Sequence, residues 1–284
     1  MNTVAASENS TWTTGQNSPK LPSLWHAPSI TARWWPVFMR NFLVWKKLFW
    51  PSLVGNTADP LISLVAFGYG LGTLVGQVSY AGQMVPYILF VASGYICTSA
   101  MNAATFEALY SAFSRMHVQK TWDGIMNAPV SLDDVVLAET LWAAFKSLFT
   151  VSAVMLVLVL LGVSHSWMLL LALPVLLLTG ICFASIAMIF TAIAKGYDFF
   201  TYYFTLFLTP MMFLSGVFFP REQLPGWVQA IAHWLPLGMA IDVVRPLFMG
   251  QLPAAPWGRI AMLVAYTVVA FWIALALIRK RFRA

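Results

Sequence analysis

Residue types that carry out chemistry are few in this chain, and their spacing does not bring them together. The four histidines, His26, His117, His165 and His233, are scattered, and both cysteines lie in apolar stretches. Metal and disulfide sites need clustered or paired ligands, so the sequence predicts neither. The motifs G-x-x-x-x-G-K-[ST], G-x-S-x-G and H-E-x-x-H are also absent from the sequence. We therefore expect no catalytic, cofactor or metal site in this chain.

Two pairs of charged residues are close enough in sequence to interact. Asp242 and Arg245 are three positions apart and can pair on one helix face, and a substrate contact is the alternative. Glu139 and Lys146 flank the start of an apolar stretch. They are interpreted as boundary charges whose long side chains reach water, with a proton relay as the alternative.

The composition excludes an ordinary water-soluble enzyme. Of the 284 residues, 60% are hydrophobic and 9% are charged, and the mean hydropathy is +0.76. A soluble domain carries about 25% charged residues, so most of this surface must face lipid. The net charge of +6 is not concentrated in a basic run with exposed aromatics, so no nucleic-acid partner is predicted.

Charge-free intervals predict an all-α integral membrane protein. No acidic or basic residue lies between Asp59 and Glu107 or between Lys146 and Lys195. Each interval is long enough for two crossings of about 20 residues joined by a short turn. The first turn, residues 76–83, is predicted as a polar loop flanked by glycines. The six predicted spans are about 59–76, 84–107, 140–162, 167–194, 198–219 and 258–279.

The distribution of Lys and Arg predicts the orientation of these spans. Most cations adjoin the two termini and the 108–139 loop, whereas the other side receives only Arg221, Arg245 and Arg259. Cytoplasmic loops carry the excess of basic residues, so both termini are predicted to be cytoplasmic. Residues 1–30 are polar, lack an apolar signal-peptide core and are predicted to form a disordered cytoplasmic tail.

Three segments contain more than a membrane crossing requires. Residues 34–50 mix tryptophans with Arg40, Lys46 and Lys47, which predicts an interfacial helix. Such a helix could be a membrane anchor or a gate that contacts a partner, and both interpretations stay open. Residues 218–247 are too apolar for a free loop and too rich in proline for a crossing. They predict two outer re-entrant helices, which include Trp227 and Trp234.

The loop between Glu107 and Glu139 predicts a short cytoplasmic helix. Trp122, Ile125 and Met126 have the spacing of one apolar face, and Ser131 begins the next helix as an N-cap. That face could dock in a groove of another protein or only link two spans. In the first span, Gly68, Gly72 and Gly76 allow close helix approach, either within the subunit or between two copies.

The chain resembles the membrane-spanning permeases of ABC-2 type exporters over residues 30–284. Within that family the pattern is similar to the branch of nodulation lipo-oligosaccharide exporters and daunorubicin-type drug exporters. The stretches that carry the resemblance are 213–220 (FLSGVFFP), 224–225, 234–237 (WLPL), 242–245 (DVVR), 127–131 (NAPVS) and 135–139 (VVLAE).

This resemblance implies a dimer of six-span subunits, each bound to a separate cytoplasmic ATPase that holds ATP and Mg²⁺. Residues 33–50 would be the interfacial connecting helix, and residues 31–284 the transmembrane domain. The re-entrant pair would close the outer side of a pathway between protomers. The coupling helix that inserts into the ATPase would include Trp122, Asp123, Ile125, Met126 and Asn127.

The first and fifth spans would line that pathway and rearrange when ATP closes the two ATPases. The resulting expectation is ATP-driven export of a lipo-oligosaccharide, glycolipid or drug across the bacterial inner membrane. The rival class is a six-span ion-coupled transporter or channel that works without an ATPase. The expected lining residues are Phe67, Tyr69, Tyr202, Tyr203, Phe207, Met211, Met212, Phe213 and Phe218.

Overall fold

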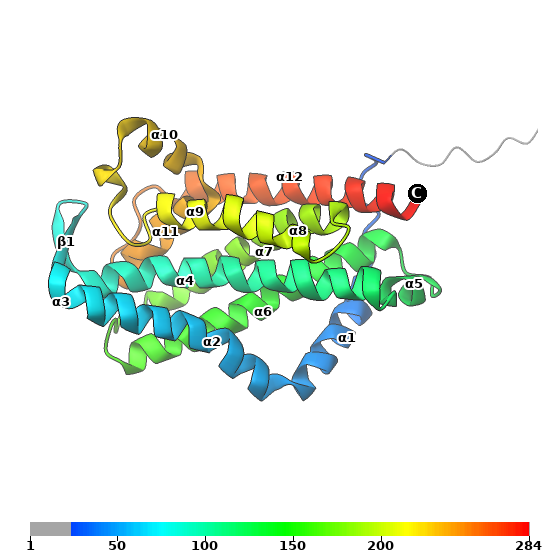
Figure 1. Cartoon of the computed structure of the whole chain (residues 1–284), viewed down its shortest axis with the longest axis horizontal. Helices are drawn as coiled ribbons and strands as arrows, with labels where there is room; N and C mark the ends of the chain where they lie inside the picture. The colour runs from blue at the N-terminus through cyan, green and yellow to red at the C-terminus, as the bar shows by residue number, and fades with distance from the viewer. Residues whose placement is uncertain (1–23, 284) are drawn as a thin grey trace, which may run out of the picture.

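The structure is a computed structural model that describes residues 24–283, and it is an elongated bundle of helices (Figure 1). Long helices run along the main axis. Helix α5, the C-terminal end and the first described residues lie at one end, here called the α5 end. A β-hairpin and helices α10 and α11 lie at the opposite end, the α10 end. The predicted tail lies outside the described residues up to residue 23.

Helix α1 (Trp34–Lys47) lies at an angle outside the bundle and breaks from α2 (Phe49–Val65) at Leu48 (Figure 1). Its aromatic face packs on α6: Phe38, Phe42 and Trp45 lie 5.7, 6.5 and 6.0 Å from Trp142 between ring centroids. The opposite side exposes apolar side chains together with Lys46 and Lys47. A helix with one packed aromatic face and one exposed face thus lies where the sequence predicted an interfacial helix, over residues 34–50.

The first crossing begins ten residues before its predicted start. Helix α2 continues through the π-helical segment η1 (Ala66–Leu71) and α3 (Gly72–Val75), so the apolar run covers Phe49–Val75. Asp59, which the charge pattern placed at the boundary, therefore lies within the helix. The helix ends at Gly76, whose φ of 67° is a conformation that glycine adopts without strain.

A two-stranded antiparallel hairpin replaces the predicted 76–83 loop. Strand β1 (Gln77–Tyr80) pairs with β2 (Gln83–Pro86), with Val78 opposite Val85. Ala81 and Gly82 form the turn with φ values of 49° and 77°. Two consecutive positive φ values are what a tight two-residue hairpin turn requires. The prediction of a loop was wrong here: it rested on the polar residues and glycines of 76–83, whereas Val78 and Val85 favour strands and are buried opposite each other.

Three further predicted spans correspond to long, apolar helices in the middle of the chain. Helix α4 (Tyr87–Phe106) continues through π-helical segments η2 (Glu107–Ser111) and η3 (Ser114–Val118). Helices α6 (Leu132–Leu160) and α7 (Leu169–Ile193) follow. Short α5 (Thr121–Met126) connects η3 to α6, and the Ser131 hydroxyl accepts the Asp134 N–H as the predicted N-cap. The core is built where α4, α6 and α7 pack together.

The fifth predicted span is a shorter helical run. It consists of α8 (Asp198–Tyr203), η4 (Phe204–Leu208) and α9 (Thr209–Leu214), segments of six, five and six residues. It ends before the predicted residue 219 because residues 215–220 form a loop with Gly216 at φ 79°. Within residues 24–283, five helices are long and apolar enough to cross a membrane, and the last is α12 (Pro256–Arg283).

A broken helix pair lies where the outer re-entrant helices were predicted. After the 3₁₀ turn η5 (Arg221–Gln223), helix α10 (Gly226–Trp234) meets α11 (Pro236–Phe248) at an angle of 84°. Helix α11 is buried against α4 and α7, whereas α10 exposes Trp227 and Trp234. This end of the bundle is therefore closed by helical protein rather than by a free loop.

Candidate functional site

The α5 end contains a short helix whose apolar face points into the protein. Trp122 is fully buried, stacks on Phe282 at 6.1 Å and donates its indole N–H to Glu139 Oε1 at 3.3 Å. Ile125 and Met126 pack against the same core. The exposed residues of this region are Asp123, Gly124, Asn127, Ala128 and Pro129.

This arrangement changes which part of the predicted coupling helix is available to a partner. The sequence assigned docking to the stripe of Trp122, Ile125 and Met126, but the structure uses that stripe to fix α5 onto the subunit. The accessible face is the polar one that carries Asp123 and Asn127. The spacing of Trp122, Ile125 and Met126 predicted an apolar face, but spacing does not determine whether that face packs within the subunit or against a partner.

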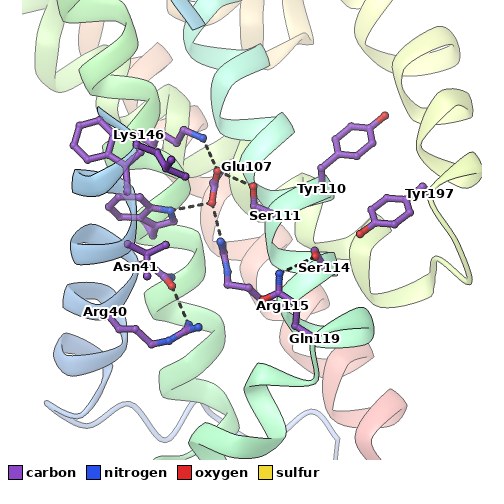
Figure 2. A pocket seen from close by; sticks show the side chains of 14 residues that line it. Arg40, Asn41, Glu107, Tyr110, Ser111, Ser114, Arg115, Gln119, Lys146 and Tyr197 are labelled. Atoms are coloured by element: carbon purple, nitrogen blue, oxygen red, sulfur yellow. Dashed lines mark hydrogen bonds and ion pairs between the residues drawn. The ribbon is translucent and has the colours of Figure 1, made fainter. Parts of the chain in front are cut away.

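Behind α5 lies a buried ionic cluster that the sequence did not predict as a unit. Arg115 Nη2 is 2.9 Å from Glu107 Oε1 and 2.5 Å from Glu139 Oε2. Lys146 Nζ lies 2.8 Å from Glu107 Oε2, and the Trp142 indole N–H donates to Glu107 Oε1 at 2.9 Å. Figure 2 shows Arg115 and Lys146 pointing toward Glu107 from opposite sides.

The cluster corrects the interpretation of Glu139 as a boundary charge that reaches water, whereas Lys146 keeps 21% of its side chain exposed. Glu139 has no exposed surface, and Glu107 is only 4% exposed. A buried carboxylate is tolerated when cations and hydrogen-bond donors compensate it, and here two glutamates share two cations. The compensation comes from residues 8, 24 and 39 positions apart, so no local motif reveals it.

A cavity of about 410 Å³ opens beside this cluster, between α1, the end of α4 and α6 (Figure 2). Glu107, Arg115 and Lys146 line one side of it. Arg40 and Asn41 of α1 line another, and Arg40 Nη1 donates to Asn41 Oδ1 at 3.2 Å. Burial lowers the pKa of the Arg40 guanidinium, opposed by the nearby charge of Glu139. The cavity therefore lies between α1 and the ionic cluster, to which α5 is bonded through Trp122.

A second buried pair holds the start of the described chain at the α5 end. Arg279 Nη2 lies 2.5 Å from Asp133 Oδ2, and Arg279 Nη1 donates to the backbone oxygens of Leu24 and His26. The backbone N–H of Ser29 donates to Asp133 Oδ2 at 2.8 Å. Residues 24–30, which the sequence assigned to a disordered tail, are thus bound to α6 and α12.

The expected pathway residues divide into an exposed group and a packed group. Tyr69, Tyr202, Phe207 and Phe213 are 45–64% exposed. Tyr203 is instead buried and lies 4.3 Å from Phe190 between ring centroids. It is therefore a packing residue in this conformation. Met211 and Met212 are half-buried against the core.

Aromatic contacts bring the first and fifth predicted spans together near the α10 end. Phe218 lies 4.8 Å from Phe67 and 5.5 Å from Phe213 between ring centroids. Gly68 contributes to packing within the subunit, because a Cβ there would lie 2.9 Å from the Ile88 side chain of α4. Gly72 has only an ordinary contact with Tyr87, and Gly76 is the turn residue described above.

The predicted pair between Asp242 and Arg245 is wrong. Asp242 instead forms ion pairs with Arg221 and with Arg259, whose Nε is 2.9 Å from Asp242 Oδ2. Arg245 is 2% exposed and lies 3.7 Å above the Phe90 ring, with hydrogen bonds to Ser93 Oγ and Gly216 O. The two side chains leave α11 toward different neighbours, which sequence spacing alone does not determine.

A family model described as "ABC-2 type transporter" matches residues 33–249, which include α1, the buried cluster, α5 and the broken helix pair. This chain belongs to the ABC-2 type transporter family. It is the membrane-spanning permease subunit of an ABC transporter, a multi-pass membrane protein of a class that is generally not catalytic itself. Family membership implies a cytoplasmic ABC ATPase as its partner.

Curated relatives agree with this assignment. The ABC-2 permease is 46% identical to "Nodulation protein J" of Rhizobium meliloti (strain 1021) over 248 residues, 87% of this chain and 93% of the relative. It is 45% identical to "Nodulation protein J" of Rhizobium leguminosarum bv. viciae over 254 residues, 89% and 96% of the two chains. "Inner membrane transport permease YadH" of Escherichia coli (strain K12) is 27% identical over 232 residues, 80% and 88% of the two chains.

Proposed function

We propose that this permease forms a dimer, binds two copies of a cytoplasmic ABC ATPase and exports an amphipathic substrate across the bacterial inner membrane. ATP and Mg²⁺ would be bound by the ATPase. The α5 end would face the cytoplasm, as the excess of Lys and Arg there indicates. The substrate would be a lipo-oligosaccharide, glycolipid or drug, the classes to which the resemblance points.

The observation that carries this proposal is the construction of α5. Its inner face is fixed by Trp122, which is bonded to Glu139, and its outer face presents Asp123 and Asn127. A force applied to the outer face would pass through the Trp122–Glu139 contact to Arg115 and Glu107, and so to α4 and α6. A mere linker between two helices needs no such rigid connection.

The assignment of α5 as the docking element is tested by placing positive charges on its exposed face. We expect Asp123→Arg combined with Asn127→Arg to abolish copurification of the ATPase while the permease stays folded, because neither side chain is packed in the core. Gln83→Arg, on the exposed hairpin at the α10 end, is the matched control. Undiminished association of the double variant would reject α5 as the docking element.

Export itself is tested with proteoliposomes that contain the permease and an ABC ATPase that copurifies with it. Accumulation of a lipo-oligosaccharide, a glycolipid and an aromatic drug is compared with ATP, without ATP and without the ATPase. We expect transport of one class only when ATP and ATPase are both present. Equal transport without the ATPase, driven by an ion gradient, would favour the rival class of ion-coupled transporter.

A further inference from the structure

Glu107 is the carboxylate that lines the cavity beside α1, and its acceptor sites are filled by the protein itself. Its Oε1 accepts from Arg115 and from the Trp142 indole, both at 2.9 Å. Its Oε2 accepts from Lys146 at 2.8 Å and from the Ser111 hydroxyl at 2.9 Å. Each carboxylate oxygen has two lone pairs, so these donors leave no acceptor on Glu107 for a cationic or hydroxyl-bearing ligand.

The cations that line the same cavity keep donors that no described residue accepts. Arg40 makes one hydrogen bond, to Asn41 Oδ1, although a guanidinium has five N–H donors (Figure 2). None of the ion pairs formed within residues 24–283 includes Arg40. Within the described chain Arg115 donates from Nε and Nη2 but not from Nη1, and Lys146 makes one hydrogen bond with an ammonium that has three donors. The cavity therefore presents hydrogen-bond donors to a ligand.

The charges around the cavity do not balance. Arg40, Arg115 and Lys146 are positive, whereas Glu107 and Glu139 are the negative groups bonded to them, which leaves an excess of one positive charge. Burial lowers the pKa of Arg40, Glu139 opposes this shift, and the like charge of Arg115 adds to it. Arg40 and Arg115 thus repel each other, and an anion in the cavity would be attracted to both.

The surroundings of the cavity match the headgroup region of a bilayer. Glu107 is the last residue of the second predicted span, and Trp45 and Trp142, of a residue type enriched at membrane interfaces, line the cavity. Val44 and Leu48 of α1 also line it and are 53% and 58% exposed. Cationic donors and exposed apolar side chains therefore adjoin one cavity, as a molecule with an anionic head and acyl chains requires.

The same groups disfavour other ligands. An ammonium or choline head would add a positive charge beside Arg40 and Arg115. A neutral sugar would leave the excess charge uncompensated. A free phosphate would satisfy the donors but would leave Val44 and Leu48 exposed. Arginine and lysine bind phosphate oxygens with charge-assisted hydrogen bonds, so a phosphate that carries acyl chains satisfies both parts of the cavity.

We propose that the cavity between α1 and the ionic cluster binds the phosphate of one anionic bilayer phospholipid. The donors would be Arg40, Arg115 and Lys146, and the acyl chains would lie against Val44 and Leu48. A phosphate bonded to both arginines would tie the interfacial helix α1 to η3 at the end of α4. The lipid is a bound partner and not the cargo, so the inference does not depend on which substrate is exported.

The test measures binding of fluorescent lipids to the full-length permease in dodecyl maltoside micelles. The probes are phosphatidylglycerol, phosphatidylcholine and diacylglycerol with identical acyl chains. We expect phosphatidylglycerol to bind about tenfold more tightly than the other two, the effect of one charge-assisted hydrogen bond. Glycerol 3-phosphate at the same concentration should not displace it. Displacement would show a site for free phosphate, and equal affinities for the three lipids would show no selection of charge. Either result would overturn the proposal.

Arg40→Gln tests the donor that no carboxylate holds. It should weaken phosphatidylglycerol binding about tenfold and leave the thermal unfolding temperature in lipid-free micelles unchanged, because the described chain gives Arg40 no ion pair. Lys47→Gln is the matched control: it removes the same charge from the same helix, at an exposed position outside the cavity lining, and should bind like the wild type. Equal losses in the two variants would show attraction by surface charge alone and would overturn the proposal, as would unchanged binding by Arg40→Gln.

Val44→Glu and Leu43→Glu form a second matched pair on α1. Both side chains are 53% exposed, so both variants should fold, but of the two only Val44 lines the cavity. Val44→Glu places a negative charge beside the phosphate and should reduce phosphatidylglycerol affinity about tenfold relative to Leu43→Glu. Equal affinities of these two proteins would reject the cavity as the lipid site. None of these measurements requires transport, so their outcome is separate from whether ATP-driven export is observed.

Discussion

Trp122 of α5 donates its indole N–H to Oε1 of Glu139 on α6 across 3.3 Å, and both side chains are fully buried. This contact fixes the short helix at the α5 end to a long helix of the bundle. Arg115 bonds to the same Glu139 carboxylate, so one side chain connects the proposed docking helix to the ionic cluster.

Trp122→Ala should destabilise the permease by about 3–5 kcal/mol, because it leaves a cavity against Phe282 and removes a donor to Glu139. Trp122→Phe retains an aromatic ring and should cost less, about 1–3 kcal/mol for the lost hydrogen bond. Thermal unfolding of the purified protein in detergent measures both. A Trp122→Ala protein as stable as the wild type would contradict the buried position of this residue.

Glu107→Gln should destabilise by about 3–5 kcal/mol, because it leaves the half-buried side chains of Lys146 and Arg115 without part of their counter-charge. Adding Lys146→Met to Glu107→Gln removes the cation that lost its partner and should restore part of the stability. Denaturant titration of the single and double variants checks this expectation. Simple additivity of the two substitutions would show that the pair does not interact.

A double-mutant cycle distinguishes the ion pairs of the structure from the pair predicted by spacing. Asp242→Asn and Arg221→Gln should show a coupling of about 0.5–3 kcal/mol, because the two side chains are bonded. Asp242→Asn and Arg245→Gln should be additive within about 0.5 kcal/mol. The readout is the free energy of unfolding. Stronger coupling to Arg245 than to Arg221 would favour the prediction made from sequence.

Gly94→Ala should destabilise by about 1–3 kcal/mol because the new Cβ would lie 2.9 Å from Val217 Cα and 3.0 Å from Arg245 Nη2. Backbone atoms cannot move aside as a flexible side chain can. Gly258→Ala in α12 is the control: it meets nothing within 4 Å and should be neutral or slightly stabilising. Thermal unfolding of both proteins tests this contrast, and equal stabilities would show that α4 and the 215–217 loop are less closely packed.

Much of the fold was predictable because hydropathy is additive along a chain. The third, fourth and sixth predicted spans correspond to α6, α7 and α12. Most of their ends agree within a few residues, but α6 begins about two turns before its predicted start and α12 ends about one turn after its predicted end. Ser131 was identified as an N-cap because its hydrogen bond is local. The first span was placed too late because a charged residue was taken as its boundary, although helix α2 passes through Asp59.

The candidate sites were less predictable because their residues meet across the sequence. Glu107 and Lys146 are 39 positions apart, and neither forms a local motif. Tyr203 and Tyr202 are neighbours with the same hydropathy, yet one is 2% exposed and the other 64%.

Composition and residue order were sufficient to predict a multi-pass membrane protein, the positions of its longest helices and the side that carries most of its Lys and Arg. These properties depend on composition and local order, which are independent of how the helices pack. By contrast, the inward position of Trp122 and the pairing of Asp242 with Arg221 rather than Arg245 became known only from the folded chain. Pairing and burial depend on which helix faces which, and that choice is made by contacts between residues far apart in the chain.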